Sequence, residues 1–417
     1  MNPLRSFRSL VRFRPIELRS STRRLARAAS VDDLRRQARR RLPRAVFDYI
    51  DGGAEDERTL DRNVSGYARL EFRPRVLRDM SNLDTSISLF GRSLPTPLIL
   101  APTGFTRIAD PEGELAVARA AARVGVPYNL STMGTRSIEE VAAVSNGPKW
   151  FQVYAWRDRG LIAELVGRAR DAGYEAIMLT VDTAVLGRRE RDVRLGTTLP
   201  PKIGLNTIVD GIIHPAWTYG LVTNEPITFA NVAGRHGLDG SSAITLADYA
   251  ASQFDPALSW DQVEWLRSQW DGPIILKGVQ TVADAELAVA HGVEGIAISN
   301  HGGRQLDDAP PVVELIEPVA QAVAGRSAII ADGGIRRGGD ILKSLALGAD
   351  AVMVGRAYLY GLGAAGEAGV DHVLAFLLDG LRRTMALTGC RTIGEIEPDL
   401  VTWRRDDPST TPWTGGH

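Results

Sequence analysis

The segment SNHGGRQLD, which contains His301, is the part of the chain best suited to acid–base chemistry. A neutral imidazole can accept a proton near physiological pH, and a nearby carboxylate would stabilise the imidazolium that forms. Asp182, at the end of the apolar run AIMLTVD, is a candidate for that carboxylate. A lone histidine could equally be a turn residue that donates to the backbone, but a histidine–carboxylate pair favours catalysis.

Two cations could complement this pair. Arg304 lies three residues after His301, and the intervening Gly302 and Gly303 permit a tight turn that would bring both side chains to one site. Lys277 lies in the apolar run IILKGV, where a charge is costly unless it is paired. It could form an internal salt bridge, but its place near a strand end favours contact with an anionic group.

Two glycine-rich stretches, ADGGIRRGGD and GADAVMVGRA, predict a phosphate site. Backbone N–H groups at helix starts bind phosphate, and Arg336 and Arg356 would add positive charge. Ordinary turns also use Gly-Gly pairs. These stretches, however, accompany the last two predicted strands, where barrels of parallel strands often bind phosphate. A phosphate site, a lysine and a His–Asp pair together indicate a phosphorylated cofactor beside an acid–base site.

Eight short apolar runs, most of them followed by a helical pattern, would position these residues. Such runs are typical of strands buried on both faces of a parallel sheet. They cover residues 98–104, 127–132, 150–155, 176–182, 274–279, 295–301, 328–334 and 351–357. This alternation predicts an α/β protein, a single (β/α)8 barrel with strands between about residues 98 and 357. A doubly wound sheet is the alternative, but its glycine fingerprint is missing after the first strand.

Polar residues gather where six of these runs end. Active sites of such barrels lie at the carboxyl ends of the strands, so one rim should carry the chemistry. Structural pairing could explain one such residue but hardly six strands that deliver polar groups to the same rim. The residues are Gln152, Tyr154, Thr180, Asp182, Lys277, Asn300, His301, Asp332 and Arg356.

Two segments lie outside the repeating units. Ser30 can cap a helix over VDDLRRQARRRL, and Pro43 opens a second helix that stops at Gly52, so we expect an N-terminal helical extension. The interval between Asp182 and Ile274 is at least twice the usual repeat. It predicts a long insertion after the fourth strand, and such insertions often form lids or partner surfaces at the catalytic end.

Composition excludes several classes of protein. A net charge of −1 gives no indication of nucleic-acid binding. The single cysteine, Cys390, excludes a disulfide framework and a cysteine-based metal site, and we expect no metal. No stretch approaches the roughly 18 apolar residues of a membrane span. Residues 1–30 carry eight arginines and one acid, which predicts a disordered basic tail, with targeting or membrane-surface binding as alternatives.

Several motifs resemble those of the FMN-dependent L-2-hydroxy acid dehydrogenases and oxidases. They are FDYIDGGAEDE, WFQVYAWRDR, LTVDTAVLGRRERD, SNHGGRQLD and ADGGIRRGGD. The resemblance covers residues 31–395, which would form one barrel domain, with residues 396–417 as a C-terminal tail. It implies FMN as the cofactor. HPAW and FDPALSWDQVEWLRSQWDGP in the insertion are most similar to bacterial respiratory L-lactate dehydrogenases, which pass electrons to membrane quinones.

The resemblance implies a role for each matching residue. His301 would be the catalytic base, oriented by Asp182, while Lys277 would stabilise the reduced flavin. Arg189 and Arg304 would hold the substrate carboxylate. Hydrogen bonds to the substrate would come from Tyr49 and from Tyr154, which we also count as catalytic. The residues expected to line the flavin are Ala101, Thr103, Ser131, Gln152 and Thr180. Those expected around its phosphate are Asp332, Gly334, Arg336, Gly355 and Arg356.

These roles predict oxidation of an L-2-hydroxy acid, foremost L-lactate to pyruvate, with electrons passed to a quinone or another non-oxygen acceptor. The alternatives are an oxidase or monooxygenase that uses dioxygen, a flavin enzyme that modifies a peptide in cofactor maturation, and a non-catalytic FMN-binding barrel. Met133 stands where the plant oxidases have a tryptophan, which predicts a wider side-chain pocket. We expect a cytoplasmic homo-oligomer, a tetramer, with peripheral contact at the inner face of the cell membrane as a further option.

Overall fold

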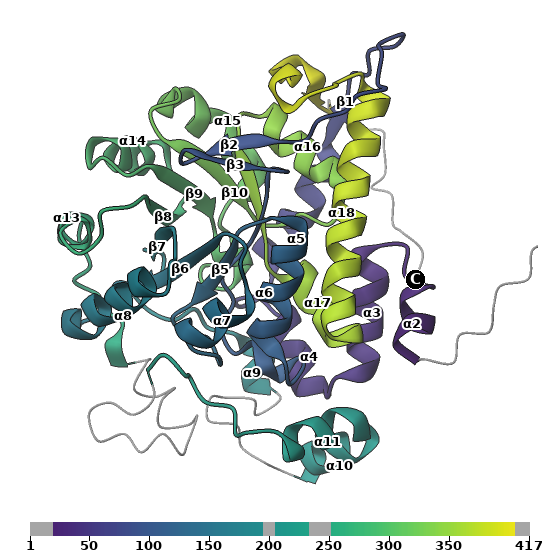
Figure 1. Cartoon of the computed structure of the whole chain (residues 1–417), viewed down its shortest axis with the longest axis vertical. Helices are drawn as coiled ribbons and strands as arrows, with labels where there is room; N and C mark the ends of the chain where they lie inside the picture. Colours follow the sequence, from purple (N-terminus) through teal and green to yellow (C-terminus); the bar gives the residue numbers. More distant parts are fainter. Residues whose placement is uncertain (1–19, 195–204, 233–251, 405–417) are drawn as a thin grey trace, which may run out of the picture.

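A closed barrel of eight parallel strands forms the centre of the protein (Figure 1). The computed structural model describes residues 20–194, 205–232 and 252–404. The barrel strands are β4 (Leu98–Leu100), β5 (Tyr128–Ser131), β6 (Lys149–Tyr154), β7 (Ala176–Thr180), β8 (Ile274–Val279), β9 (Gly295–Ser299), β10 (Ala328–Asp332) and β11 (Ala351–Val354). They pair in chain order, and β11 closes the barrel on β4. Each of the eight predicted runs contains a strand, so the predicted (β/α)8 barrel is confirmed.

The barrel interior changes from apolar to polar along the strands. Every second residue of a strand points inward. Near the amino ends, the inward residues Met178, Ile275 and Ile330 belong to one buried apolar cluster. The β2–β3 hairpin (Ile87–Leu89 and Arg92–Leu94) contributes to the same cluster and covers this end. Two residues further along β8 and β10, the inward positions are Lys277 and Asp332, so the polar chamber lies at the carboxyl ends.

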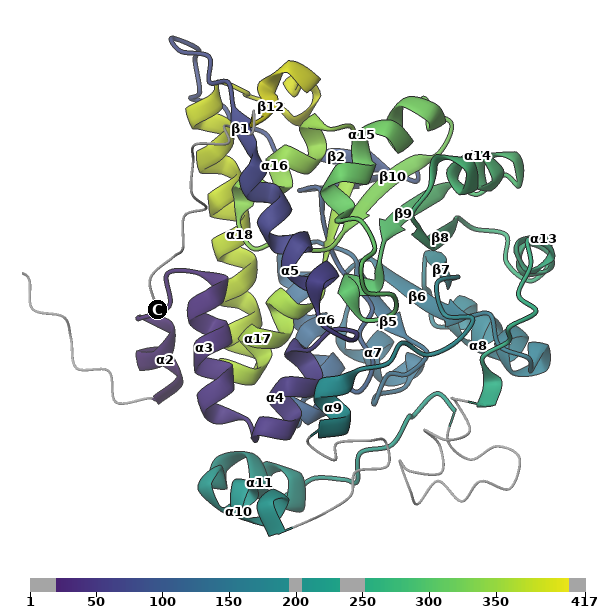
Figure 2. The same ribbon diagram turned by 180° about the vertical axis from the view of Figure 1, so that it is seen from behind.

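Helices surround the barrel. Those that follow its strands are α6 (Gly113–Val124), α7 (Ile138–Val144), α8 (Arg159–Asp171), α13 (Asp261–Arg267), α14 (Val282–Ala290), α15 (Val312–Val323), α16 (Gly338–Ala346), α17 (Arg356–Ala365) and α18 (Glu367–Thr388). The predicted N-terminal extension consists of α3 (Val31–Arg41), α4 (Arg44–Asp51) and α5 (Arg58–Ser65). Ser30 caps α3 by accepting a hydrogen bond from the Asp33 N–H at 3.1 Å, as expected. Figure 2 shows α3 packed beside α17 and α18.

Regular secondary structure is present within both predicted tail segments. α2 (Ser20–Leu25) lies within the expected basic tail, and the Arg24 Nε donates to the Ala364 carbonyl at 3.0 Å. β12 (Val401–Trp403) lies within the expected C-terminal tail and pairs with β1 (Leu70–Phe72). Tertiary contacts therefore order both segments. Predictions for residues 1–19 and 405–417 lie outside the described residues.

The insertion after the fourth barrel strand runs along the carboxyl end of the barrel. Its described helices before α13 are α9 (Glu190–Arg194), α10 (Leu205–Ile213) and α11 (Pro215–Thr223). α10 and α11 form a hairpin at the lower edge of Figure 1. Across the ranges that the structure describes, no helix has the length and apolarity needed to cross a membrane.

The carboxylate of Asp51 joins the N-terminal extension to the barrel helices and the insertion. It is only 3% exposed and accepts hydrogen bonds from Arg35 at 2.6 and 2.8 Å, from Arg191 at 2.9 Å and from the Tyr360 hydroxyl at 2.7 Å. Burial alone would raise the pKa of Asp51, but its bonds with Arg35, Tyr360 and Arg191 outweigh burial and hold that pKa well below its ordinary value. The C-terminus of α4 is therefore fixed from several sides.

We expect Asp51→Asn to lower the free energy of unfolding at neutral pH by about 1–3 kcal/mol, because Arg35 and Arg191 lose their shared charge partner. The folded-state pKa is depressed, so the Asp51 contribution is present above the ordinary carboxyl pKa of about 4 and declines as pH falls below it. Denaturant unfolding at several pH values between neutral and acid measures the free energy of unfolding of both proteins. Exposed Asp56, changed to Asn, is the control. The prediction would be contradicted if the difference in unfolding free energy between Asp51→Asn and the native protein were as large at acid pH as at neutral pH.

Candidate active site

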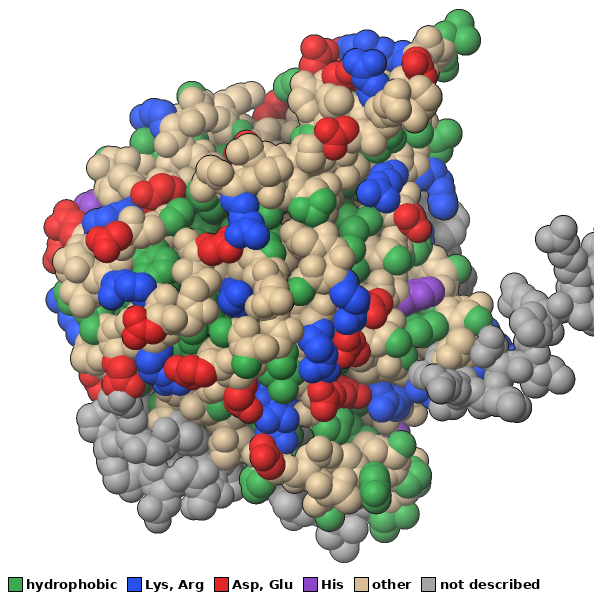
Figure 3. All heavy atoms as spheres, viewed as in Figure 1, with side chains coloured by type: hydrophobic (Ala, Val, Ile, Leu, Met, Phe, Trp, Pro, Cys, Tyr) green, Lys and Arg blue, Asp and Glu red, His purple; other side chains and the backbone are tan. Residues whose placement is uncertain are grey.

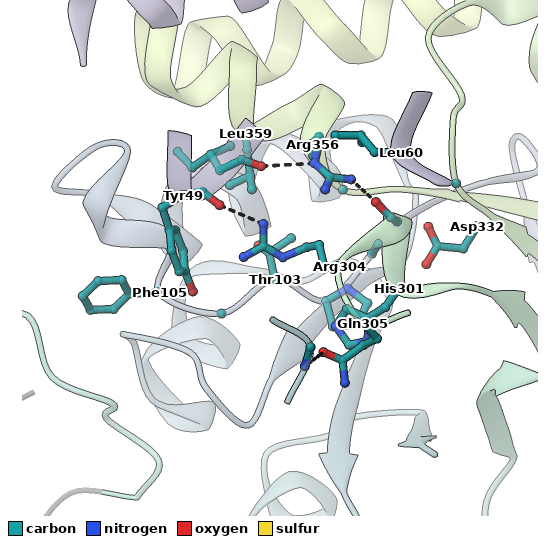
Figure 4. Close-up of a pocket in the computed structure, with 18 of the residues that line it drawn as sticks. Tyr49, Leu60, Thr103, Phe105, His301, Arg304, Gln305, Asp332, Arg356 and Leu359 are labelled. Carbon is teal, nitrogen blue, oxygen red and sulfur yellow. Dashed lines mark hydrogen bonds between the residues drawn. The ribbon is translucent and has the colours of Figure 1, made fainter. Parts of the chain in front are cut away.

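A cavity of about 490 Å³ opens at the carboxyl ends of the barrel strands (Figure 4). This volume falls in the range of small-molecule and cofactor sites. Its walls come from the loops after the strands, from α4 and α5, and from the insertion. Sequence-predicted residues that line it are Tyr49, Ala101, Thr103, Tyr154, Arg189, Lys277, His301, Arg304, Asp332, Gly334, Arg336, Gly355 and Arg356.

His301 and Asp182 form the predicted pair. The His301 Nδ1 lies 2.9 Å from the Asp182 Oδ1, and His301 lines the cavity while Asp182 is buried behind it. The turn after β9 gives His301 a φ of +56°, a backbone conformation uncommon outside glycine. Its N–H donates to the Ser299 Oγ at 3.0 Å. The imidazole is thus held at Nδ1, and Nε2 is left as the nitrogen available to a bound molecule.

The protonation state of Asp182 determines which nitrogen of the His301 ring carries the proton. Burial alone would raise the pKa of Asp182, but the charges of His301 and Lys277 outweigh it, so this pKa lies below the ordinary carboxyl value. An ionised carboxylate accepts a hydrogen bond from Nδ1–H, which leaves Nε2 of the neutral ring as a proton acceptor. This is the arrangement that a general base requires.

Arg304 and Arg189 come together around the ring of Tyr49. Their guanidinium carbons lie 5.1 and 5.4 Å from its centroid. The Arg304 Nη1 donates to the carbonyls of Tyr49 and Gly52, at 2.8 and 3.0 Å, and Arg189 is paired with Asp192 at 3.2 Å. Burial, and then repulsion from Arg189, lower the pKa of Arg304 to about 10. A bound anion would offset the repulsion between these two neighbouring guanidinium groups and would form hydrogen bonds with them.

A buried polar cluster links Lys277 to the His301 turn. Lys277 is 3% exposed, and its Nζ donates to the Ser299 Oγ at 3.1 Å. That hydroxyl donates to the Asp332 Oδ2 at 3.0 Å and also accepts from the His301 N–H. We did not predict Ser299 as a site residue. The inward alternation of β9, in which Ser299 follows the barrel-interior Ala297, was the available signal.

Helix α5, which lies outside the repeating units of the barrel, forms the wall of the cavity next to the glycine-rich turns. The amides of Asn63 in α5 and Asn300 after β9 bond reciprocally at 2.8 and 2.9 Å. Gly334, with a φ of +81°, approaches the same helix so closely that a Cβ on it would lie 1.8 Å from the Asn63 carbonyl oxygen. Asn63 lines the cavity and was also missed, because no local pattern connects it to a site 237 residues away.

Two arginines lie beside the glycine-rich turns. Half-buried Arg356, the first residue of α17, donates to the carbonyls of Ile50, Gly302 and Gly52 at 3.1, 2.7 and 2.7 Å. Burial lowers the pKa of this guanidinium. The guanidinium carbon of Arg336 lies 5.7 Å from the Tyr360 ring centroid. Cationic groups and helix starts therefore coincide here, which suits a bound phosphate.

Three predicted flavin-lining residues lie behind the cavity surface. The Ser131 Oγ donates to the Gln152 Oε1 at 2.8 Å, and the Gln152 Nε2 donates to the Thr180 Oγ1 at 3.0 Å. This chain crosses β5, β6 and β7, and all three side chains are at most 2% exposed. Their contact with a flavin stays a prediction.

Apolar side chains wall another part of the cavity. Phe105 lies 6.2 Å from Tyr49 and 5.5 Å from Phe229, measured between ring centroids. Met133 lines the cavity, and so does Phe254, which comes, like Phe229, from the insertion. Burial, and then Asp182, raise the pKa of Tyr154, so its hydroxyl stays protonated and can donate a hydrogen bond. We did not predict the three phenylalanines, because single apolar residues of a loop or an insertion carry no motif.

The sequence profile of the FMN-dependent dehydrogenases matches residues 38–403. The chain belongs to this family. The L-lactate dehydrogenase of Haemophilus influenzae (strain PittEE) is 44% identical over 377 residues, 89% of this chain and 98% of that protein. The L-lactate dehydrogenase of Caulobacter sp. (strain K31) is 43% identical over 374 residues, with the same coverage of both chains.

Solved structures show the same fold. The monotopic membrane protein (S)-mandelate dehydrogenase superposes with a TM-score of 0.86 at 38% identity, over 90% of this chain and all of that one. Mandelate oxidase with (S)-4-hydroxymandelic acid superposes with a TM-score of 0.78 at 42% identity, over 90% of this chain and 99% of that one.

The donor set of this FMN-dependent dehydrogenase fits its cofactor. Lys277 supplies a buried positive charge at the barrel axis, where a flavin ring that becomes anionic on reduction would be stabilised. Arg336 and Arg356 lie beside glycine-rich turns and helix starts that can hold a phosphate. The cavity thus offers cations that would suit both the phosphate of FMN and a flavin ring that becomes anionic.

Gly334→Ala should destabilise the protein by about 1–3 kcal/mol more than Gly325→Ala. Both glycines have a positive φ, of +81° and +73°, so both variants incur the cost of left-handed backbone. Only at Gly334 would the new Cβ meet backbone, since nothing lies within 4 Å of it at Gly325. Denaturant unfolding and the FMN content of each variant measure the effect. Equal losses of stability would contradict the predicted packing of α5 against this turn.

Proposed function

We propose that this dehydrogenase oxidises an L-2-hydroxy acid to the 2-oxo acid, and that the substrate is L-lactate. One observation carries the proposal: a histidine backed by a buried carboxylate shares a cavity with two adjacent arginines. A base and an anion site together suit a substrate with a hydroxyl next to a carboxylate. The naming of the bacterial relatives as L-lactate dehydrogenases supports lactate.

The substrate carboxylate is held by Arg189 and Arg304. A guanidinium can donate two parallel hydrogen bonds to a carboxylate, which orients the α-carbon as well as binding the anion. Arg304 is kept in place by the carbonyls of Tyr49 and Gly52. The hydroxyl groups of Tyr49 and Tyr154 add hydrogen bonds to the substrate.

His301 Nε2 receives a proton from the substrate. Asp182 keeps the ring oriented through Nδ1 and stabilises the imidazolium that results. Bound FMN supplies the acceptor for the two electrons that leave the substrate. Lys277 provides positive charge beside it, and Ser299 fixes the position of that ammonium group. Both a hydride and a carbanion route use His301 in this position.

We propose further that a quinone or another non-oxygen compound, rather than dioxygen, reoxidises the enzyme. The dehydrogenase names of the bacterial relatives support this acceptor, and a structural neighbour described as a monotopic membrane protein supports peripheral contact with the inner face of the cell membrane. A homo-oligomer, foremost a tetramer, is the expected assembly.

His301→Gln should lower kcat with L-lactate by about 10²–10⁴-fold, because glutamine preserves much of the shape but cannot act as the base. FMN content should stay at the native level, since none of the proposed phosphate-binding side chains is altered. The control is His291→Gln, since His291 lies away from the cavity and stacks on Trp260 at 5.1 Å between ring centroids. Steady-state turnover with an artificial dye measures both variants. An undiminished kcat in His301→Gln would exclude the proposed base.

An acceptor assay separates the two parts of the proposal. Under anaerobic conditions L-lactate should bleach the flavin absorbance, and a soluble quinone should restore it faster than air does. Peroxide release at the rate of dye-linked turnover would contradict the proposed non-oxygen acceptor. It would leave the proposal that L-lactate is the substrate unaffected. The proposal that L-lactate is the substrate would be contradicted if another L-2-hydroxy acid, or a peptide, bleached the flavin and L-lactate never did.

A further inference from the structure

Residues 182–189, between β7 and α9, carry two of the side chains that the proposed function uses. Asp182 at the start of this segment pairs with His301, and Arg189 at its end lies beside Arg304. The segment contains no helix or strand, and the two large apolar side chains within it are 67% and 50% exposed. Neither regular backbone pairing nor burial of these side chains fixes the segment, so its position depends on other contacts.

The side-chain amide of Gln305 supplies several of these contacts. Its Nε2 donates to the carbonyls of Asp182 and Val185, both at 3.0 Å, and its Oε1 accepts a hydrogen bond from the Gly187 N–H at 3.0 Å. Both N–H groups of the amide are therefore used, and their carbonyl partners fix which end of the amide is the nitrogen. Figure 4 shows Gln305 in the wall of the cavity. One side chain thus holds the backbone of residues 182–187 at three points.

The backbone of the segment packs directly against the turn after β9. A Cβ on Gly187 would lie 2.5 Å from the Gln305 carbonyl oxygen and nearer still to the Arg304 carbonyl oxygen. Because no side chain separates the two backbones at Gly187, the Gln305 amide can reach the segment. At the far end of the segment, the Arg188 carbonyl accepts a hydrogen bond from the Glu55 N–H at 2.9 Å. The segment is thus attached to the turn after β9 and to the N-terminal extension.

The orientation of the Asp182 carboxylate depends on where its backbone lies. One oxygen, Oδ1, is bonded to His301, but the other, Oδ2, is buried without a hydrogen-bond partner in the described part of the chain. A single hydrogen bond leaves the carboxylate poorly oriented unless the main chain is fixed, and Gln305 holds the carbonyl of this same residue. Misplacement of a catalytic group by about 1 Å can cost about 10²-fold in rate. The amide of Gln305 therefore bears on the geometry of the base pair.

The position of Arg189 depends on the same segment, because it lies two residues beyond Gly187. The guanidinium carbons of Arg189 and Arg304 lie 5.4 and 5.1 Å from the centroid of one tyrosine ring. No broad positive surface adds to their attraction for an anion on the face drawn in Figure 3, where Lys and Arg are interspersed with Asp and Glu. Affinity for a small carboxylate therefore depends on the local spacing of the two guanidinium groups.

We propose that Gln305 is a positioning residue, whose amide sets the distance between the segment after β7 and the turn after β9 and so aligns two pairs at once. The pairs are Asp182 with His301, and Arg189 with Arg304. Their roles in catalysis and in anion binding rest on the proposed function. Gln305 acts through the backbone of the segment and not by contact with the substrate. Loss of its amide should therefore impair both flavin reduction and carboxylate binding, although every group that contacts the substrate is still present.

The variant Gln305→Met tests this proposal, because methionine keeps the length of the side chain and removes its hydrogen bonds. Anaerobic rapid mixing of the holoenzyme with L-lactate gives the limiting rate of flavin reduction, which should fall about tenfold or more. Titration of the flavin absorbance with oxalate, a dicarboxylate with no hydrogen to lose, gives a dissociation constant that should rise about fivefold or more. The matched control is Gln321→Met, since exposed Gln321 is bonded to Glu317 at 3.3 Å on the surface of α15. Both quantities should stay native in this control.

A second background separates positioning from a general loss of structure. In Asp182→Asn the carboxylate through which Gln305 acts on the base is already absent. Adding Gln305→Met to this variant should therefore slow flavin reduction by no more than about twofold, while the oxalate dissociation constant should still rise. Slowing by the same factor in both backgrounds would contradict the proposal, because the two residues would then act independently on the rate.

A native reduction rate together with a native oxalate affinity in Gln305→Met would overturn the proposal. If this variant does not retain FMN, Gln305→Glu decides at neutral pH, because it keeps the length and the acceptor for Gly187 but has no N–H for the two carbonyls. Slower flavin reduction in Gln305→Glu would support the proposal, and reduction at the native rate would overturn it. If L-lactate does not reduce the flavin of the native protein, the proposed substrate is wrong. The oxalate titration needs no turnover, so it would still test the positioning of the arginine pair.

Discussion

The hydrogen bond between Asp182 and His301 joins the segment after β7 to the turn after β9, across the intervening strand β8. This approach is possible because Gly278 on β8 has no side chain: a Cβ there would lie 2.7 Å from that of Asp182. Lys277, one residue earlier, helps to keep Asp182 ionised. Through Ser299 the same lysine is also linked to the His301 backbone. Base, carboxylate and ammonium group are therefore positioned as one unit.

The barrel supplies this unit, but the N-terminal extension supplies much of what faces it. Carbonyls at the end of α4 accept hydrogen bonds from Arg304 and Arg356, and Asn63 of α5 holds the loop after β9. Asp51 anchors the end of α4 through Arg35 and Arg191. A site at the carboxyl end of a barrel needs a wall on its open side, and here helices from outside the repeat and phenylalanines of the insertion provide it. Substrate binding and the stability of the extension should therefore be coupled.

The barrel and its polar rim could be predicted because strands buried on both faces appear as short apolar runs. Once these runs are taken as parallel strands, Lys277, His301 and Asp332 must lie at the same end. Ser299 could have been predicted from the alternation of β9. Asn63 could not, because its contact with Asn300 spans 237 residues and no local pattern encodes it. The three-residue strand β12 is too short to show periodicity, and its order depends on pairing with β1.

Anaerobic rapid mixing of the Asp182→Asn variant with L-lactate tests the role of the Asp182–His301 pair most directly. An asparagine of the same shape cannot stabilise the imidazolium, so flavin reduction should slow by about 10²–10⁴-fold while the L-lactate dependence of the rate still reports near-native binding. The pair of arginines that binds the carboxylate is unchanged in this variant. Flavin reduction at the native rate would contradict the proposal that Asp182 and His301 act together as the base.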